Sequence, residues 1–294
     1  MWTLTISAAH GQSAGFITGT LSAVSGPVSI LTSMRIASWN VNSLNARMPR
    51  VGEWLERMQP DVVCIQETKL AADAFPTAEF EAMGYESAHH GLNQWNGVAI
   101  LSKVGLDNVV NDFADGGDPD VDARVIWAHC GGVDVASVYV PNGREVDHEH
   151  YHYKLHWLGR LRSHLGQNCD PKKPVAVLGD FNIAPTDDDV WDTKAFAGKT
   201  HVTKPERDAL ANITEWGLAD TFRHVYPDHP GLFSYYDYTA GRFHKRQGIR
   251  IDLILASEPL LKTVTGALVD RNGRKAWDGN KPSDHVPLYA DFAI

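Results

Sequence analysis

Cysteine is scarce in this sequence, which has only Cys64, Cys130 and Cys169 among its 294 residues. An odd number of cysteines without a C-x-x-C spacing argues against a disulfide framework and gives no support to a structural zinc site. We therefore expect the protein to work in a reducing cytoplasm.

Signals for a membrane are missing as well. Residues 1–33 contain no Asp, Glu, Lys or Arg, so they lack the basic start of a signal peptide, and Ser, Thr and Gly interrupt every apolar run. We expect no membrane association, and we interpret residues 1–33 as a poorly ordered extension. Because Met34 opens the first strand-like run, the alternative is that translation begins there.

Positive charge is the third deficit, since 27 Lys and Arg against 36 Asp and Glu give a net charge of −9. A protein that binds a polyanion usually has the opposite balance. The bases are nevertheless clustered, with four in residues 241–250 and four in residues 271–281, whereas residues 107–122 carry six aspartates and no base. We expect a basic stripe on one face, and a solvated loop for the acidic segment because it lacks EF-hand spacing.

Residues 34–294 contain no linker, repeat or low-complexity tract, which predicts a single domain. Short β-rich runs alternate with helical patterns, and this alternation indicates α/β layers. The expected strands are residues 35–41, 61–66, 97–102, 124–129, 133–140, 174–178, 249–255 and 286–292, and the expected helices are residues 47–58, 149–165 and 204–216.

Polar residues that suit metal binding or proton transfer stand at the ends of several expected strands, where α/β proteins place their ligands. They are Asn40, Glu67, Asp180, Asn182, Asp252, Asp284 and His285. Glu67 and Asn40 offer the hard oxygen ligands that Mg²⁺ prefers. Asp252 and His285 suit a carboxylate–imidazole pair, in which the acid favours the imidazolium. Asp180 is then a candidate to activate water.

Six short motifs also occur in a fixed order along the chain. They are Trp39–Asn42, Ile65–Lys69, Tyr139–Gly143, Gly179–Asp187, Arg250–Asp252 and Lys281–His285. Together they resemble the exodeoxyribonuclease III family of apurinic/apyrimidinic endonucleases, within the endonuclease/exonuclease/phosphatase superfamily. The resemblance runs from Met34 to the C-terminus. It implies a four-layered α/β sandwich with two facing mixed β-sheets flanked by helices, which is the DNase I-like fold.

The same resemblance implies a monomeric repair nuclease that hydrolyses double-stranded DNA at abasic sites and 3′ ends with Mg²⁺, or with Mn²⁺ in its place. Glu67 would be the principal metal ligand, and the whole set expected around the metal is Asn40, Glu67, Asp180, Asn182, Asp284 and His285. Tyr139, Asn182 and His285 would contact the scissile phosphate. Asp180 would activate water, and Asp252 would orient His285.

The expected DNA contacts also follow from the resemblance. Lys69, the turn that contains Asn142, and the segment around Tyr235 and Tyr236 match the exonuclease III branch, and Arg124 occupies the place of an arginine that the family uses on the DNA backbone. The remaining expected contacts are the basic residues Arg47, Arg246 and Arg250. The family commonly has Trp where this chain has Tyr235 or Tyr236, so the balance between abasic-site incision and 3′→5′ exonuclease activity stays open.

Three alternatives remain at the level of sequence. The protein could be a scaffold that binds DNA without cleaving it, or another phosphodiesterase or phosphatase of the same superfamily. Residues 148–152 also match the zinc-protease motif H-E-x-x-H. That motif follows a turn and an acidic loop without a clear third ligand, so we expect the start of a solvated helix there instead.

Overall fold

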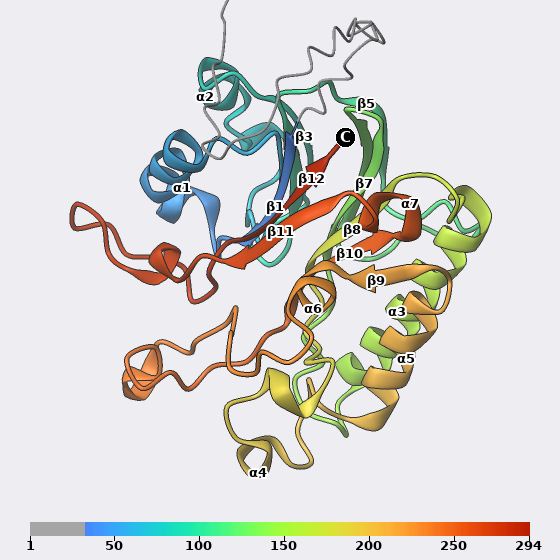
Figure 1. The fold of residues 1–294 in the computed structure, drawn as a ribbon, viewed down its shortest axis with the longest axis vertical. Helices are drawn as coiled ribbons and strands as arrows, with labels where there is room; N and C mark the ends of the chain where they lie inside the picture. Colours follow the sequence, from blue (N-terminus) through green and yellow to red (C-terminus); the bar gives the residue numbers. More distant parts are fainter. Residues whose placement is uncertain (1–32) are drawn as a thin grey trace, which may run out of the picture. The chain divides into compact units, whose positions relative to one another are not determined.

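Two six-stranded β-sheets lie face to face in the computed structural model, which describes residues 33–294 (Figure 1). The first sheet has the order β11 (Val264–Val269), β12 (Leu288–Ala293), β1 (Ser33–Asn40), β2 (Val62–Gln66), β4 (Val98–Ser102), β3 (Glu86–His90). The second has the order β5 (Asp107–Asn111), β6 (Val125–Cys130), β7 (Val133–Tyr139), β8 (Val175–Asp180), β10 (Asp252–Ser257), β9 (Leu218–Asp220). Apart from Ser33, the expected extension of residues 1–33 lies outside the described residues.

The helices are α1 (Leu44–Met58), α2 (Thr77–Ala82), α3 (Glu149–Asn168), α4 (Thr193–Phe196), α5 (Lys204–Thr214), α6 (Thr221–Val225) and α7 (Glu258–Leu261). Some of the helices cover the outer faces of the two sheets, namely α1 on the first and α3 and α5 on the second. Figure 1 shows α1 and α2 beside the first sheet and α3 and α5 beside the second. Among the described residues, no helix combines the length and the apolar character that a membrane crossing needs.

Alternation along the strands builds the layers, because successive side chains of a strand point to opposite faces. In β1, Ile36 packs between the sheets, whereas Ala37 and Trp39 pack beneath α1. In β8, Leu178 faces the first sheet, and Val177 faces α3 and α5. The predicted four-layered sandwich is therefore confirmed, and both sheets are mixed because β1 and β2, and β7 and β8, run parallel.

The expected strands and helices are all present, with shifts of a few residues at their ends. Four strands were not predicted: β3, β5, β9 and β11. Each forms an edge of its sheet. Edge strands are shorter or more exposed than central ones, and β5 is exposed along its whole length. Their weak apolar pattern explains why the sequence did not reveal them.

Candidate active site

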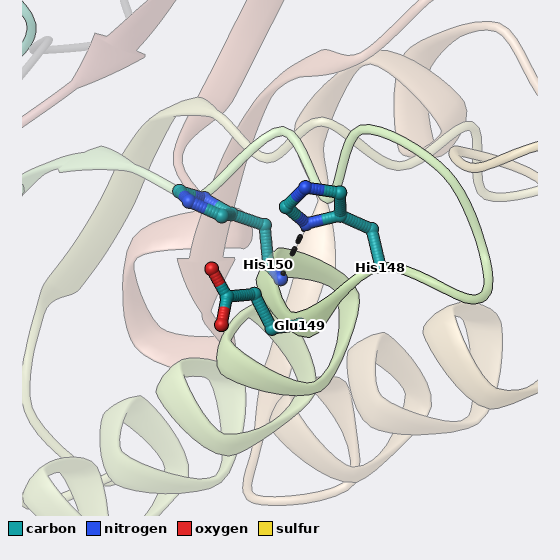
Figure 2. A group of neighbouring side chains, drawn as sticks. All are labelled: His148, Glu149 and His150. Atoms are coloured by element: carbon teal, nitrogen blue, oxygen red, sulfur yellow. Dashed lines mark hydrogen bonds between the residues drawn. The ribbon is translucent and has the colours of Figure 1, made fainter.

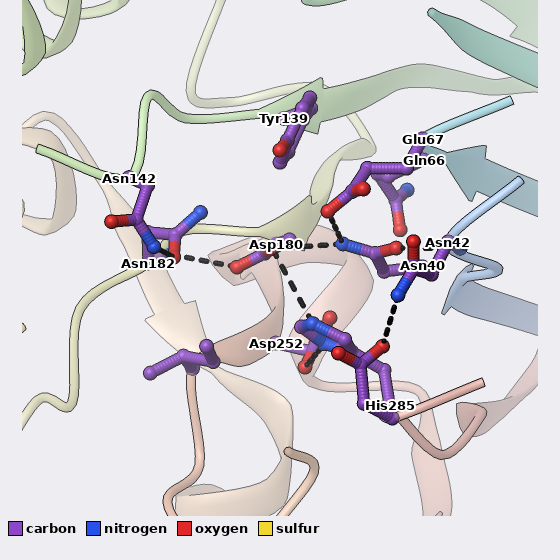
Figure 3. A network of polar contacts seen from close by, with 12 residues as sticks. Asn40, Asn42, Gln66, Glu67, Tyr139, Asn142, Asp180, Asn182, Asp252 and His285 are labelled. Atoms are coloured by element: carbon purple, nitrogen blue, oxygen red, sulfur yellow. Dashed lines mark hydrogen bonds and ion pairs between the residues drawn. The ribbon is translucent and has the colours of Figure 1, made fainter. Parts of the chain in front are cut away.

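Strand register places three candidate residues side by side in the second sheet. Tyr139 at the end of β7 pairs with Asp180 at the end of β8, and Asp180 pairs with Asp252 at the start of β10. Asn40 ends β1 in the facing sheet, and Glu67 follows β2 in the left-handed backbone region with φ 53°. Figure 3 shows these side chains converging. The backbone hydrogen bonds of two sheets thus fix the geometry.

Asn40 lies between the carboxylates of Glu67 and Asp180 and forms a hydrogen bond with each. Its Nδ2 donates to Glu67 Oε1 and to Asp180 Oδ2, each at 2.9 Å, while its Oδ1 accepts from the Asn42 backbone at 3.0 Å. Lys69 Nζ lies 3.0 Å from Glu67 Oε2. Burial alone would raise the pKa of Glu67, but Lys69 and the Asn40 hydrogen bond outweigh it, and the pKa is lowered. Glu67 is therefore a stable anion.

Asp180 has the opposite electrostatic environment. It is almost fully buried, and this burial together with the nearby Asp252 carboxylate raises its pKa to about 7, although His285 acts in the other direction. A carboxylate with a pKa near neutrality is suited to accept a proton during a reaction at physiological pH. Asp180 is thus placed to act as a general base.

His285 forms a buried pair with Asp252. Its Nδ1 lies 2.8 Å from Asp252 Oδ2, and its Nε2 lies 3.9 Å from Asp180 Oδ2. Burial would lower the pKa of His285, but Asp252 and Asp180 outweigh it and raise the pKa to about 10. The ring is therefore an imidazolium at neutral pH, and an imidazolium donates from both nitrogens. The predicted Asp252–His285 pair is present in the structure.

The donor set at the centre fits a hard divalent cation. Atoms of Glu67, Asp180 and His285 that suit metal binding lie within 4.8 Å of one another. The two carboxylates supply oxygen ligands of the type that Mg²⁺ and Ca²⁺ prefer. The raised pKa of His285 favours the protonated ring, which donates hydrogen bonds, so metal ligation by His285 stays a prediction. Asp284 accepts from Asn42 Nδ2 at 2.9 Å outside this group, so its role at the metal stays a prediction.

Asn182 and Asn142 form a second polar pair beside Asp180. Asn182 donates its backbone N–H to Asp180 Oδ1 at 2.9 Å and its Nδ2 to the Val140 carbonyl at 2.9 Å. Its Oδ1 accepts from Asn142 Nδ2 at 3.2 Å. The side-chain oxygens of Asn182 and Asn40 thus each accept one hydrogen bond from a neighbouring asparagine. Both amides position their neighbours in this structure, and metal ligation by either one stays a prediction.

Tyr139 stands against a buried arginine. The Arg124 guanidinium lies 4.6 Å from the centre of the Tyr139 ring and makes a 2.9 Å ion pair with Asp122. Burial and the Glu67 charge raise the pKa of the Tyr139 phenol well above its ordinary value, so the hydroxyl stays protonated. Arg124 is only 8% exposed; the structure places it beneath the site, and its contact with DNA stays a prediction.

Two predicted DNA contacts are wrong because the side chains are buried. Arg250 is 1% exposed, with Nε 2.7 Å from Asp189 and Nη1 2.6 Å from Asp220. Tyr236 is fully buried in the core, and its hydroxyl bonds to Arg271. Both residues stabilise the fold and do not reach the surface.

The other predicted DNA contacts are accessible to different degrees. Tyr235 is half-buried, with its ring centre 4.9 Å from that of His285, and it lines a cleft of 640 Å³ beside the site. Arg47 donates to the Tyr238 hydroxyl at 2.9 Å, and Arg246 is exposed. Lys69 belongs to the Glu67 network. Of these basic residues, Arg47 lies in α1, whereas Lys69 and Arg246 lie on loops.

The cleft beside Tyr235 is lined by basic, acidic and aromatic groups. Its bases are Arg144, Lys199 and Arg242, and its acids are Glu145, Asp147 and Asp237. The guanidinium of Arg242 lies 5.7 Å from the centre of the Trp191 ring. The basic and aromatic part of this lining suits a flat group that carries negative charge.

Sequence reasoning missed the buried polar groups behind the asparagine pair. Lys154, Glu206 and His201 lie there, and Lys154 and His201 bond to the Asn182 carbonyl. Two signals in the sequence pointed to them. Lys154 interrupts a helical stripe of buried apolar residues in α3, and the Thr203-x-x-Glu206 spacing is that of a capping box.

The H-E-x-x-H match does not form a zinc-protease site. His148 caps α3 from outside the helix, with its Nδ1 accepting from the His150 backbone at 3.1 Å (Figure 2). Its Nε2 lies 3.3 Å from the Arg144 guanidinium, a cation that opposes metal binding. The expected helix start is confirmed.

The acidic segment is more structured than expected. It begins as β5, and Asp115 and Asp120 pair with Arg160 of α3 at 2.8 and 3.7 Å. Asp189, in the acidic run Asp187–Asp189, is the buried partner of Arg250. The partner bases come from distant parts of the chain, so a local charge count did not reveal them.

Comparison with known proteins finds relatives across nearly the whole described region. Residues 37–285 match the model of the Endonuclease/Exonuclease/phosphatase family. Exodeoxyribonuclease III of Haemophilus influenzae is 32% identical over 270 residues, covering 88% of this chain and 100% of that protein. An AP endonuclease structure from Archaeoglobus fulgidus has a TM-score of 0.85 at 35% identity, covering 89% of this chain and 100% of its own. A 3′-5′ exonuclease structure from Neisseria meningitidis has a TM-score of 0.83 at 35% identity, with the same coverage.

Proposed function

Because this chain belongs to the endonuclease/exonuclease/phosphatase family, we propose that it is a metal-dependent DNA repair nuclease. It hydrolyses phosphodiester bonds of double-stranded DNA as a 3′→5′ exonuclease and as an endonuclease that cuts 5′ to abasic sites. The observation that carries the proposal is the pairing of two acids of opposite pKa shift, Glu67 and Asp180, beside the Asp252–His285 pair. The relatives named as exodeoxyribonuclease III, AP endonuclease and 3′-5′ exonuclease support it.

Each of the site residues has a separate role in the proposed hydrolysis. Asp180 takes a proton from the attacking water, whose oxygen forms the new bond to phosphorus. The His285 imidazolium and the Tyr139 hydroxyl donate to phosphate oxygens, on which negative charge grows. Asp252 keeps His285 protonated and oriented. The bond from phosphorus to the leaving oxygen breaks, and that oxygen is protonated on release.

We propose Mg²⁺ as the metal, with Mn²⁺ as a substitute. Glu67 is the ligand that the structure supports best, because its carboxylate is ionised and faces Asp180 across the Asn40 amide. When bound, the cation supplies positive charge that stabilises the phosphate oxygens and the leaving oxygen.

The substrates proposed are 3′ ends and abasic sites in duplex DNA. Tyr235 supplies an aromatic surface next to His285, and the adjoining cleft carries Arg144 and Arg242. Aromatic stacking combined with these two guanidinium groups suits a nucleotide that has left the duplex. We further propose that the protein acts as a monomer in the cytoplasm, where its three cysteines, free in the structure, stay reduced.

One set of assays tests the function. Duplexes with a single abasic analogue or a recessed 3′ end are incubated with Mg²⁺ or with EDTA, and an inositol phosphate serves as a third substrate. Metal-dependent cleavage of DNA is expected, and Asp180→Asn, purified in parallel, excludes a contaminating nuclease. DNA retention without cleavage would favour the scaffold, and hydrolysis of the inositol phosphate alone would favour another activity of the superfamily.

A further inference from the structure

A fully buried lysine lies directly behind the asparagine pair of the site. Lys154 of α3 is 0% exposed, and its Nζ lies 2.6 Å from the Asn182 carbonyl and 3.3 Å from the Asn142 carbonyl. The same Nζ lies 2.5 Å from Glu206 Oε1 and 3.4 Å from Thr200 Oγ1. An ammonium has three donors, and those of Lys154 are shared between one carboxylate and the backbone of two site loops.

Glu206 completes a cluster that joins four segments. It is also fully buried, and its Oε1 accepts from the Thr200 hydroxyl at 2.7 Å and from the His201 backbone at 2.9 Å. The Thr200 hydroxyl also approaches the Asn142 carbonyl at 3.0 Å. The cluster therefore links α3 and α5 to the loop after β7 and the loop after β8.

These loops need an external support. Asn182 has a left-handed backbone with φ 51°, and so does Arg144, next to Gly143, with φ 56°. Such conformations carry strain for residues other than glycine and persist only where the surroundings fix them. A Cβ on Gly143 would meet Thr200 Oγ1 at 2.8 Å, so the loop is packed tightly against the cluster.

We infer that Lys154 is a positioning residue for the proposed phosphodiester hydrolysis, holding the carbonyls of Asn142 and Asn182 so that their side chains stay in place beside Asp180. The inference rests on the proposed function. Lys154 itself touches no reacting atom. It acts through the backbone of the two asparagines, whose side chains bond to each other at 3.2 Å.

If the Lys154–Glu206 ion pair only stabilised the fold, a different experimental result would be expected. Removing one member of a buried pair leaves an uncompensated charge, whereas replacing both members with neutral residues is often harmless to stability. The double variant Lys154→Met/Glu206→Gln removes both charges and takes the ammonium away from the two carbonyls. Because Glu206 also caps α5 through Thr203, thermal unfolding establishes whether the fold is kept. If Lys154 only stabilises the fold, this double variant works normally.

The test measures kcat and KM on a duplex with a recessed 3′ end, with thermal unfolding monitored in parallel. For the double variant we expect kcat to fall about 100-fold, since a displacement of about 1 Å has an effect of this size, while KM stays within about twofold. The matched control is Arg160→Met, which breaks an ion pair of the same helix with Asp115 and does not contact the asparagines. It is expected to turn over as fast as the unaltered protein.

Each outcome decides the inference. A double variant with unchanged kcat, or with a loss that Arg160→Met reproduces, overturns it. If the double variant does not fold, Thr200→Val is used instead, because it removes the hydroxyl that links Glu206 to the Asn142 carbonyl while both charges of the Lys154–Glu206 pair remain. It is expected to lower kcat about fivefold, and an unchanged kcat contradicts the inference. If the unaltered protein does not cleave DNA, the proposed function fails instead.

Discussion

The Asp252–His285 pair allows a quantitative prediction for the variant Asp252→Asn. The substitution keeps the size of the side chain and removes its charge. In the structure the pKa of His285 is raised from 6.5 to about 10, in spite of burial, chiefly by Asp252 and then by Asp180. This shift corresponds to about 5 kcal/mol in favour of the imidazolium. Without Asp252 the pKa falls toward or below its ordinary value, because burial is then opposed mainly by Asp180.

The sign of the pH effect follows directly. With Asp252 present, His285 is protonated up to a pH of about 10, so its contribution to activity and to stability is complete at low pH and is lost as the pH rises through that value. In Asp252→Asn the same loss occurs near neutrality. At pH 8 we expect kcat to fall by about 10²–10⁴-fold, as is usual when a positioned acid or base is lost.

The assay follows the hydrolysis of a duplex with a recessed end under saturating Mg²⁺ and records how kcat varies from mildly acidic to strongly alkaline pH. A matched control exists in the same sheet, where Asp134 lies 2.7 Å from His129 Nδ1 in an exposed pair. Asp134→Asn breaks an equivalent contact and is expected to leave the pH profile unchanged. If the profile of Asp252→Asn superimposes on that of the unaltered protein, His285 does not act as an imidazolium and the reasoning is refuted.

Three further predictions concern single side chains. Asp180→Asn is expected to raise the melting temperature in EDTA by about 2–4 °C. The reason is that folding raises the pKa of Asp180 and so disfavours its charged form. Calorimetry at pH 8 measures the change, and a lower melting temperature contradicts the prediction. Arg246→Ala is expected to reduce the slope of log K against log salt by about one without loss of stability. Arg250→Ala is expected to lower the free energy of unfolding by about 3 kcal/mol, because it removes a buried guanidinium from both Asp220 and Asp189 and leaves Asp189 with Arg223 alone. Salt titrations of DNA binding and urea unfolding distinguish the two variants, and the reverse pattern refutes the assignment. Tyr139→Phe is expected to lower kcat about tenfold or more. Its kcat should have the same pH dependence as that of the unaltered protein, since the phenol of Tyr139 stays protonated. A pH profile of a different shape would mean that the hydroxyl titrates.

The central strands and the candidate site residues were predictable because each has a local signature. Runs such as Val175–Leu178 are apolar and bounded by turns, and the polar residue at the end of each run stands out against them. Asp180 and Asp252 were found in this way. Their relation as register partners was not predictable, because it depends on the pairing of β8 with β10.

The failures share a physical cause. Arg250 stands close to Asp252 in the sequence, and proximity to the site suggested contact with DNA, but its side chain is buried against two acids from other segments. Its partners Asp189 and Asp220 are 61 and 30 residues away. Charge compensation between distant segments cannot be derived from composition.

The aligned ends of β7, β8 and β10 have a consequence for how such an enzyme tolerates change. Tyr139, Asp180 and Asp252 are fixed by strand register, whereas Arg246 stands on a loop outside the sheets and Arg47 in α1. The groups assigned to the chemistry and the accessible bases thus belong to different parts of the fold. We expect exchange of the segment 237–247 for a loop of different composition to change the affinity for DNA, while the paired strand ends remain as they are.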